Sequence, residues 1–539
     1  MSRWYTEQDL KGVDLLWLLD LRIGGVVYRF CTEAITINDS FGNALAYQGT
    51  LSAVDFASEV EFGAADFDLP AASVTVTFRE DMAKRIAQGV DFAAGSAELA
   101  IIRKGAGDDH DDRQVVLSGR LDAPSYGAIG EPVAFNIEAD WLRSTSAIPE
   151  PGQVIDQAVN WPDAEDNVQG KIYPIIFGAP GQQGFAGSPI YIAEDTGSGT
   201  RVGLIAAHRC TAQTISVTEV QIDGQTPAIP DQTVQFALDA NGAPYAFVDI
   251  PNAHFNADAS YFASFDNGGG GLINPFAVGR DSNSSNTTAF LTGAGDVLRY
   301  LLHQSGAKVD DSRCAIASAA LNAFEIEGYV AERVNVLDLV KELVELLPCS
   351  LRATADGIYP VVWRYDATKA DCQITLEAGR EVYRQSPVEY VSGPIYNEIT
   401  LKYRHNARFN TLRKSVTVTG DLNKKTSGFV WSNVYTVSSF SRYGSRAVEF
   451  ETELISSRAT AGRVVGWMSR AYSTQHRAIT YAAPNRLAFL QVGDVVALTD
   501  ADLHLQEQVT LVQSIDYQES GLVITLLLIS DPPKDTIPT

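Results

Sequence analysis

The residues of this chain that are best suited to chemistry form two acidic clusters. The first is the run Gly107-Asp108-Asp109-His110-Asp111-Asp112, and carboxylate oxygens are the ligands that hard cations such as Ca²⁺ prefer. The run lacks the Asp-x-Asp-x-Asp-Gly order and the distal Glu of an EF-hand, which favours a solvated turn, and cation binding at Asp108–Asp112 stays open. The second cluster is Asp163, Glu165 and Asp166, and paired carboxylates are what glycosidases use. Acidic loops are common in so acidic a chain, so a structural role is favoured here too.

The rest of the chain contains no catalytic motif. It has no Gly-x-Ser-x-Gly elbow, no His-Glu-x-x-His and no Walker loop. The run Thr292-Gly293-Ala294-Gly295 lacks a third glycine and predicts a simple turn before a helix. The histidines have no spacing that predicts a shared site; they are His110, His208, His254, His303, His405, His476 and His504. The sequence therefore predicts that the protein is not an enzyme and has no catalytic residue, no cofactor and no metal ligand.

Several domains must position these residues. At 539 residues the chain is too long for one ordinary core, and three or four domains are expected. The first residues lack the apolar core of a signal peptide and no apolar run reaches membrane-spanning length, so we expect assembly in the cytoplasm. The cysteines have neither disulfide-framework nor metal-ligand spacing, and we expect free, buried thiols at Cys31, Cys210, Cys314, Cys349 and Cys372.

The charge of the chain is strongly acidic and unevenly distributed. A formal charge of -25 argues against a surface that grips nucleic-acid phosphates. Such a charge suits a conduit that passes DNA without binding it, and solubility alone explains it equally well. Between Lys402 and Arg477 basic residues outnumber acidic ones, whereas the N-terminal half is acidic. This asymmetry can make identical subunits complementary in a ring.

The first segment, to about Trp141, is predicted to be mostly β. Leu15 to Ile23 and Val26 to Phe30 flank Gly24-Gly25, and glycine supplies the positive φ values of a tight hairpin turn. Glu80 to Gln88 is predicted to be a short helix. Period-two alternation and short apolar runs predict further strands over 35–37, 73–78, 99–103, 115–117 and 133–137. A β-barrel or sandwich with one inserted helix fits these elements.

Two helices and a hairpin are predicted in the middle of the chain. Gly295 to Gln304 and Val334 to Leu347 place apolar residues at helical spacing. Asn335 is the expected N-cap of the second helix, which Pro348 ends. After it, Asp356-Gly357 lies between two short apolar runs and predicts a hairpin turn.

The last third of the chain has a distinctive order of elements and no obvious catalytic residue. A strand-like run from Gly393 to Arg404 leads to the turn Ser441-Arg442-Tyr443-Gly444, then to a helix over 456–472 and to the strand of Phe489 to Asp500. Together with the opening Gly24-Gly25-Val26-Val27-Tyr28-Arg29-Phe30, this order resembles siphophage and gene-transfer-agent-like tail tip or baseplate hub proteins.

The resemblance implies a mainly β, multidomain fold with α+β inserts, in which two tail-tube-like β-barrels accompany smaller α/β hub domains. The expected divisions are an N-terminal β-barrel hub domain (1–143), a linker (144–169), a β-rich second domain (170–288), an α+β domain with a helix and the Asp-Gly hairpin (289–388), a C-terminal tube-like β-barrel domain (389–530) and a mobile tail (531–539).

The function that the resemblance implies is structural. Three chains would form a homotrimer that closes or lines the distal end of the tail tube, with tube or distal tail proteins above and fibre or spike proteins below. Genomic DNA would pass through without specific binding, and contact with the host envelope would come through these partners. The expected location is the virion tail tip. The alternatives are a secreted or particle-bound, cell-wall-degrading carbohydrate-active enzyme and a monomeric adhesin.

Overall fold

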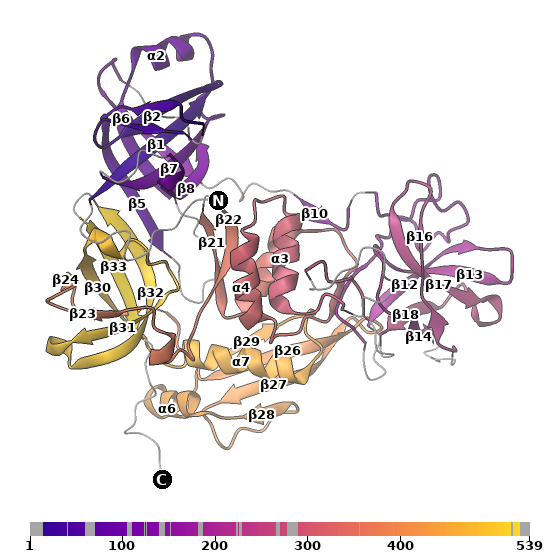
Figure 1. Cartoon of the computed structure of the whole chain (residues 1–539). Coiled ribbons are helices and arrows are strands. Elements are labelled where there is room, and N and C mark those ends of the chain that lie inside the picture. The colour runs from indigo at the N-terminus through magenta and orange to yellow at the C-terminus, as the bar shows by residue number, and fades with distance from the viewer. Residues whose placement is uncertain are drawn as a thin grey trace.

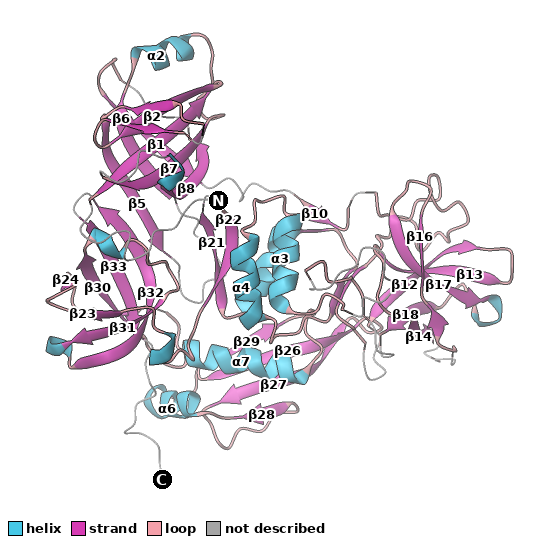
Figure 2. Ribbon diagram, in the orientation of Figure 1, coloured by secondary structure: helices cyan, strands magenta, loops and turns pink. Residues whose placement is uncertain are grey.

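The computed structural model describes residues 14–528 except 40, 60–70, 105–109, 123, 125–126, 139–145, 151, 182–186, 222–224, 226–228, 266–269, 277–288, 355, 392 and 519–520. Within these ranges the fold is mainly β and multidomain, as predicted (Figures 1 and 2). No helix of the described part of the chain is long and apolar enough to cross a membrane. The predicted tail, 531–539, lies outside the described residues.

The N-terminal strands curve into a nearly closed barrel (indigo in Figure 1). Gly24 and Gly25 adopt φ values of 55° and 80°, so the predicted hairpin is confirmed. A separate hairpin, β3 (Ile35–Asn38) with β4 (Ala44–Tyr47), and helix α2 (Glu80–Ala87) accompany the barrel. The barrel strands, in sheet order, are β2 (Val26–Cys31), β1 (Leu15–Ile23), β7 (Ser96–Arg103), β8 (Gln114–Leu121), β9 (Pro132–Glu138), β6 (Ala71–Thr77) and β5 (Leu51–Glu59).

The C-terminal strands continue the same sheet. β5 pairs antiparallel with β32 (Leu505–Gln518), which places Phe56 opposite Tyr517. Trp17 packs edge-on against both rings, with centroids 6.4 and 5.7 Å away, and one hydrophobic core runs through this junction. The sheet, fourteen-stranded in all, is completed by β33 (Gly521–Leu528), β30 (Arg477–Ala483), β31 (Val495–Asp500), β23 (Thr375–Glu377), β24 (Tyr383–Arg384) and β25 (Glu389–Tyr390).

The second β-rich unit is a seven-stranded sheet (right side of Figure 1). Its own core includes Ile205, Ile215 and Val248. The preceding segment, predicted as a linker, contributes the buried Ile155 and Trp161 to the core of the helical unit. The sheet order is β15 (Gln232–Thr233), β14 (Thr214–Val220), β18 (Ser260–Ser264), β12 (Ser188–Asp195), β13 (Thr200–Ala206), β17 (Pro244–Pro251) and β16 (Gln235–Leu238).

Helix α3 (Ala294–Gln304) packs against both α4 (Asp311–Leu321) and α5 (Val336–Leu346), and α3 and α4 lie at the centre of Figure 1. The two predicted helices are confirmed, and the side chain of Asn335 caps α5 by accepting from the Leu337 amide at 2.8 Å. Helix α4 was not predicted. The helical unit also contains β21 (Cys349–Thr354) with β22 (Gly357–Val362), β10 (Ala147–Ile148) with β20 (Val334–Asn335), and β11 (Ile175–Phe177) with β19 (Gly328–Val330).

The predicted hairpin is present as β21 and β22, but Gly357 lies in a strand and not in the turn. Gly357 is the first residue of β22 and pairs with Thr354, so it belongs to the ladder and not to the turn. Its φ is 136°, and a Cβ here would lie 2.6 Å from the backbone nitrogen of Asp310. The glycine therefore allows the segment before α4 to approach β22 closely. In this contact the Asp310 amide donates a hydrogen bond to the Ile358 carbonyl.

A four-stranded α/β unit (orange, lower centre of Figure 1) precedes the last strands of the large sheet. Its strand order is β28 (Phe429–Trp431), β27 (Thr411–Thr419), β26 (Glu398–Asn406) and β29 (Ala447–Glu451), with helices α6 (Val434–Tyr443) and α7 (Arg458–Tyr472). The predicted Arg-Tyr-Gly turn is wrong in part, because Arg442 and Tyr443 close α6 and only Gly444, at φ 68°, leaves the helix. The predicted 456–472 helix is confirmed as α7, capped by Ser457.

Two helical glycines allow a paired test of the packing between α3 and α4. A Cβ on Gly295 would lie 2.5 Å from the Cα of Ser318 in α4, whereas a Cβ on Gly462 in α7 meets nothing within 4 Å. Gly295→Ala should therefore lower the free energy of unfolding by roughly 1–3 kcal/mol through overpacking. Gly462→Ala should raise it by about 0.5–1 kcal/mol through helix propensity. Chemical denaturation measures both changes, and equal effects would contradict the close α3–α4 contact.

Candidate functional site

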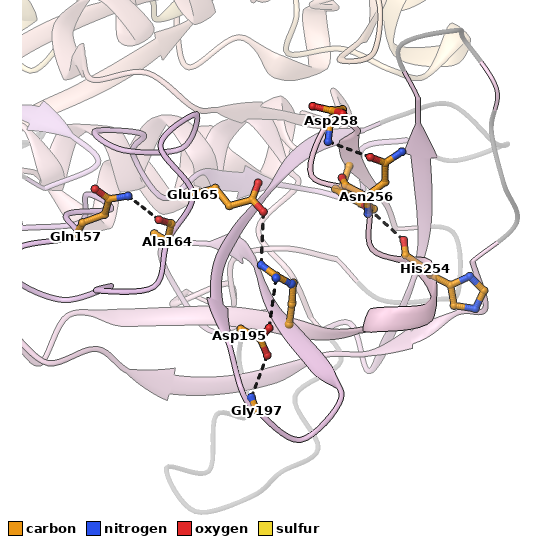
Figure 3. A network of polar contacts seen from close by, with 10 residues as sticks. Gln157, Ala164, Glu165, Asp195, Gly197, His254, Asn256 and Asp258 are labelled. Carbon is orange, nitrogen blue, oxygen red and sulfur yellow. Dashed lines mark hydrogen bonds and ion pairs between the residues drawn. The ribbon is translucent and has the colours of Figure 1, made fainter.

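Of the predicted carboxylate cluster at Asp163, Glu165 and Asp166, Glu165 belongs to a polar network around Arg201 (Figure 3). The Arg201 guanidinium lies 3.5 Å from Glu165 Oε1 and 3.3 Å from Asp195 Oδ2. Asp166 instead accepts a hydrogen bond from Gln157 Nε2 at 3.0 Å, and Asp163 is exposed. The three carboxylates thus have separate surroundings and do not form a matched acid–base pair.

Arg201 also ties this loop to the aromatic residues of the seven-stranded sheet. Its guanidinium lies 3.8 Å from the centroid of the Phe255 ring, which stacks on Tyr261 at 6.4 Å. Burial raises the pKa of Glu165, and the Arg201 charge opposes that rise while Asp258 adds to it. The arrangement fastens the loop of Glu165 to β12 and β13, which is a positioning role.

The acidic run at Asp108–Asp112 is described only in part, because Asp108 and Asp109 lie outside the described residues. His110 Nε2 lies 3.9 Å from Oδ2 of the buried Asp20, and Arg113 Nη1 lies 3.6 Å from the same oxygen. Burial raises the pKa of Asp20, but the hydrogen bond to His110 and the charge of Arg113 outweigh burial and bring this pKa below its ordinary value. The described end of the run thus takes part in a buried ion cluster.

The remaining histidines and the cysteines occupy separate places. His208 accepts from the Ile176 amide at 3.0 Å, and burial lowers its pKa to about 4. His303 lies 2.9 Å from Asp311, and His405 lies 3.6 Å from Glu453. Four cysteines are buried and Cys372 is half-buried. In the part of the chain that the structure describes, no group of three His, Cys, Asp or Glu residues is placed to hold a metal ion.

Sequence reasoning missed a groove at the α/β unit. Its volume is about 640 Å³, and it opens where α7 begins. Lys414 lies opposite Tyr403 in the ladder, and Phe429 lies opposite Val416. Because paired residues share a face of a sheet and successive residues alternate, Tyr403, Lys414 and Phe429 all point to the face that α7 covers further along. The excess of basic residues between Lys402 and Arg477 was the available signal.

Charges of both signs line this groove. Arg458, the first residue of α7, places its guanidinium 5.0 Å from the centroid of the half-exposed Phe429 ring. Arg404 has a φ of 62° and donates from Nε to the Ser456 carbonyl at 3.1 Å. Glu325 and Glu327 line the same groove. Burial and the charge of Glu325 raise the pKa of Glu327 to about 7, against the pull of Arg404.

Glu327 gives the folded state a pH dependence of known sign. Its folded pKa of about 7 exceeds the ordinary value of 4.5, so the folded state holds a proton that the unfolded state releases between these values. Stability should fall as pH rises from about 4.5 to about 7. Glu327→Gln should remove this loss and raise the free energy of unfolding at pH 8 by roughly 1–3 kcal/mol.

Urea denaturation from pH 5 to pH 8 measures this change, with Glu389→Gln on an exposed strand as the control. The free energy of unfolding of the control should change with pH as that of the wild type does. A Glu327→Gln variant that keeps the full wild-type slope would contradict the assignment.

Comparisons with known proteins point to phage tails. Residues 431–515, from β28 to β32, match the family model of putative phage tail proteins. Solved structures similar to this chain include the tail protein from Neisseria meningitidis MC58 (10% identity, TM-score 0.39, 96% of this chain and 97% of that one covered) and the 43 kDa tail protein of prophage MuSo2 from Shewanella oneidensis (10%, 0.36, 95% and 96%).

A chain of the native gene transfer agent virion is also similar (13% identity, TM-score 0.37, 72% of this chain and 92% of that one covered). Comparison with curated proteins gave no match. The resemblance to phage tail proteins noted in the sequence is thus confirmed by the family model over the segment that contains α6, α7 and the strands that follow.

Proposed function

We propose that this chain is a structural hub of a phage-like tail tip, which closes or lines the distal end of the tail tube. The observation that carries the proposal is the match of residues 431–515 to putative phage tail proteins. The N-terminal barrel and the C-terminal strands share one sheet and one core. This continuity suits a protein under mechanical load, because main-chain pairing of β5 with β32 resists separation of the N-terminal barrel from the C-terminal strands.

In the proposed assembly three copies surround the channel as a homotrimer. Tail tube or distal tail proteins lie above, and fibre or spike proteins lie below. The short strands β24 and β25 carry the exposed Tyr383 and Tyr390. Exposed tyrosines on short strands suit protein contacts, because aromatic residues are enriched at interfaces. The proposed divisions of the chain remain those expected from its sequence.

The acidic charge supports the proposed passage of DNA. A formal charge of -25 repels phosphate, so DNA moves through the ring without specific binding. The chain is not an enzyme in this proposal, and contact with the host envelope is made by its partners. The proposed location is the distal end of the virion tail.

Native mass spectrometry of the purified chain, 58.3 kDa per copy, tests the assembly. A stable homotrimer is expected, and a monomer at micromolar concentration would overturn the ring. Gold-labelled antibodies against the chain, imaged on tail particles, test the location. Label at the distal tip is expected, and label on the head or along the tube would contradict the hub.

The competing function is a cell-wall-degrading enzyme. A peptidoglycan zymogram of the purified chain should show no clearing, because Glu165 pairs with Arg201, Asp166 accepts from Gln157 and Asp163 is exposed, so the three carboxylates form no acid–base pair. Clearing that is lost in Glu165→Gln but kept in Asp163→Asn would favour the enzyme over the hub.

A further inference from the structure

The α/β unit carries a charge opposite to that of the rest of the molecule. Residues 402–477 contain thirteen Lys and Arg against four Asp and Glu, a formal charge of +9. Because the whole chain carries -25, the remainder carries -34. A second copy of the chain thus presents acidic surface to this basic unit, and such complementarity steers and orients association.

Only some of these cations are neutralised within the chain. Lys402 pairs with Glu449 and Glu451, and Lys424 pairs with Glu398. Among the described residues, Lys414 and Arg458 form no ion pair with a carboxylate, and both are exposed. These two unneutralised cations face the same groove.

The start of α7 strengthens the attraction of this groove for anions. A helix N-terminus carries a partial positive charge, and acidic residues normally occupy its first turn. Helix α7 has none there and begins with Arg458 instead. Placing a cation at the positive end of a helix costs stability, and a carboxylate from outside the chain would offset that cost.

The aromatic residues beside these cations indicate a protein partner. Phe429 is 49% exposed beneath Arg458, and Phe409, at the turn between β26 and β27, is 50% exposed beneath Arg408 and Arg413 at 4.7 and 4.2 Å. Arginine and aromatic side chains are the types that dominate the energetics of protein interfaces. The Arg–aromatic pairs are already formed, so less ordering is needed when a partner docks.

Nucleic acid fits this groove less well. A phosphate backbone requires a track of positive charge, and its affinity comes from many cations acting together. Here Glu325 and Glu327 line the same groove as Lys414 and Arg458, and ionised carboxylates repel phosphate. A protein surface can place carboxylates against the two cations and a hydrogen-bond donor against the two glutamates.

We propose that the groove lined by Lys414, Phe429 and Arg458 is the docking site for an acidic surface of a second copy of this chain. The inference rests on the proposed homo-oligomer and assigns one of its contact surfaces. The basic groove of each subunit binds acidic residues of the next, so each copy gives one such surface and takes one.

The test is a charge reversal with a matched control. Lys414→Glu with Arg458→Glu reverses two groove cations, whereas Lys425→Glu with Arg442→Glu makes the same net change on exposed residues of the same unit that do not line the groove. Sedimentation velocity across a concentration series measures self-association, and thermal unfolding checks that both variants fold. The groove variant should associate at least about tenfold more weakly than wild type, and the control within about twofold.

Three outcomes would overturn the inference. A folded groove variant that associates like the wild type removes the groove from the interface while the oligomer stands. Wild-type chain that is monomeric at every concentration removes the homo-oligomer itself. Tight binding of a labelled single-stranded DNA oligonucleotide in fluorescence anisotropy, lost in the groove variant and kept in the control, assigns the groove to nucleic acid.

Discussion

The pairing of β5 with β32 is the contact on which the large sheet depends. These strands lie more than four hundred residues apart in the sequence, and their ladder joins the N-terminal barrel to the C-terminal strands. The interdigitated rings of Trp17, Phe56 and Tyr517 bury the junction, and aromatic contacts of this kind add to the main-chain hydrogen bonds. One hydrophobic core continues from the barrel through this junction to the C-terminal strands.

The α/β unit differs from the large sheet in both topology and charge. Its four strands include parallel pairs, β26 with β29 and β27 with β28, and α7 covers one face of them. Parallel pairing needs crossover connections, and the unit with these connections contains thirteen of the 41 Lys and Arg residues of the chain. The large sheet therefore joins the two ends of the chain, whereas the α/β unit carries the basic charge.

Elements with strong local patterns were predictable from the sequence. Helix α5 repeats apolar residues at helical spacing after an Asn cap, and the Gly24-Gly25 hairpin has the turn residues its geometry requires. Helix α4 escaped prediction because its residues, rich in Ala and Ser, give little contrast between faces. Helix α6 is rich in Ser, Thr and aromatic residues, which are weak helix formers. Its available signal was the capping box of Asn433 and Thr436.

The candidate site was harder to predict than the fold. Composition revealed the basic excess between Lys402 and Arg477, but a groove requires knowledge of which strands are neighbours. Tyr403, Lys414 and Phe429 come from three strands, and Glu327 comes from a fourth segment that lies earlier in the chain. Such convergence depends on long-range pairing, which local periodicity does not encode. The same holds for Arg201, whose partners Glu165 and Phe255 are distant from it in sequence.

The β5–β32 ladder also governs the order of events during synthesis. While the ribosome is still translating the middle of the chain, β5 has no partner on one side, because residues 514–517 do not yet exist. An unpaired edge of this kind is a template for improper strand pairing. The edge of β5 stays unpaired for most of translation. Premature termination therefore leaves a fragment in which β5 is free to pair with a strand of another chain.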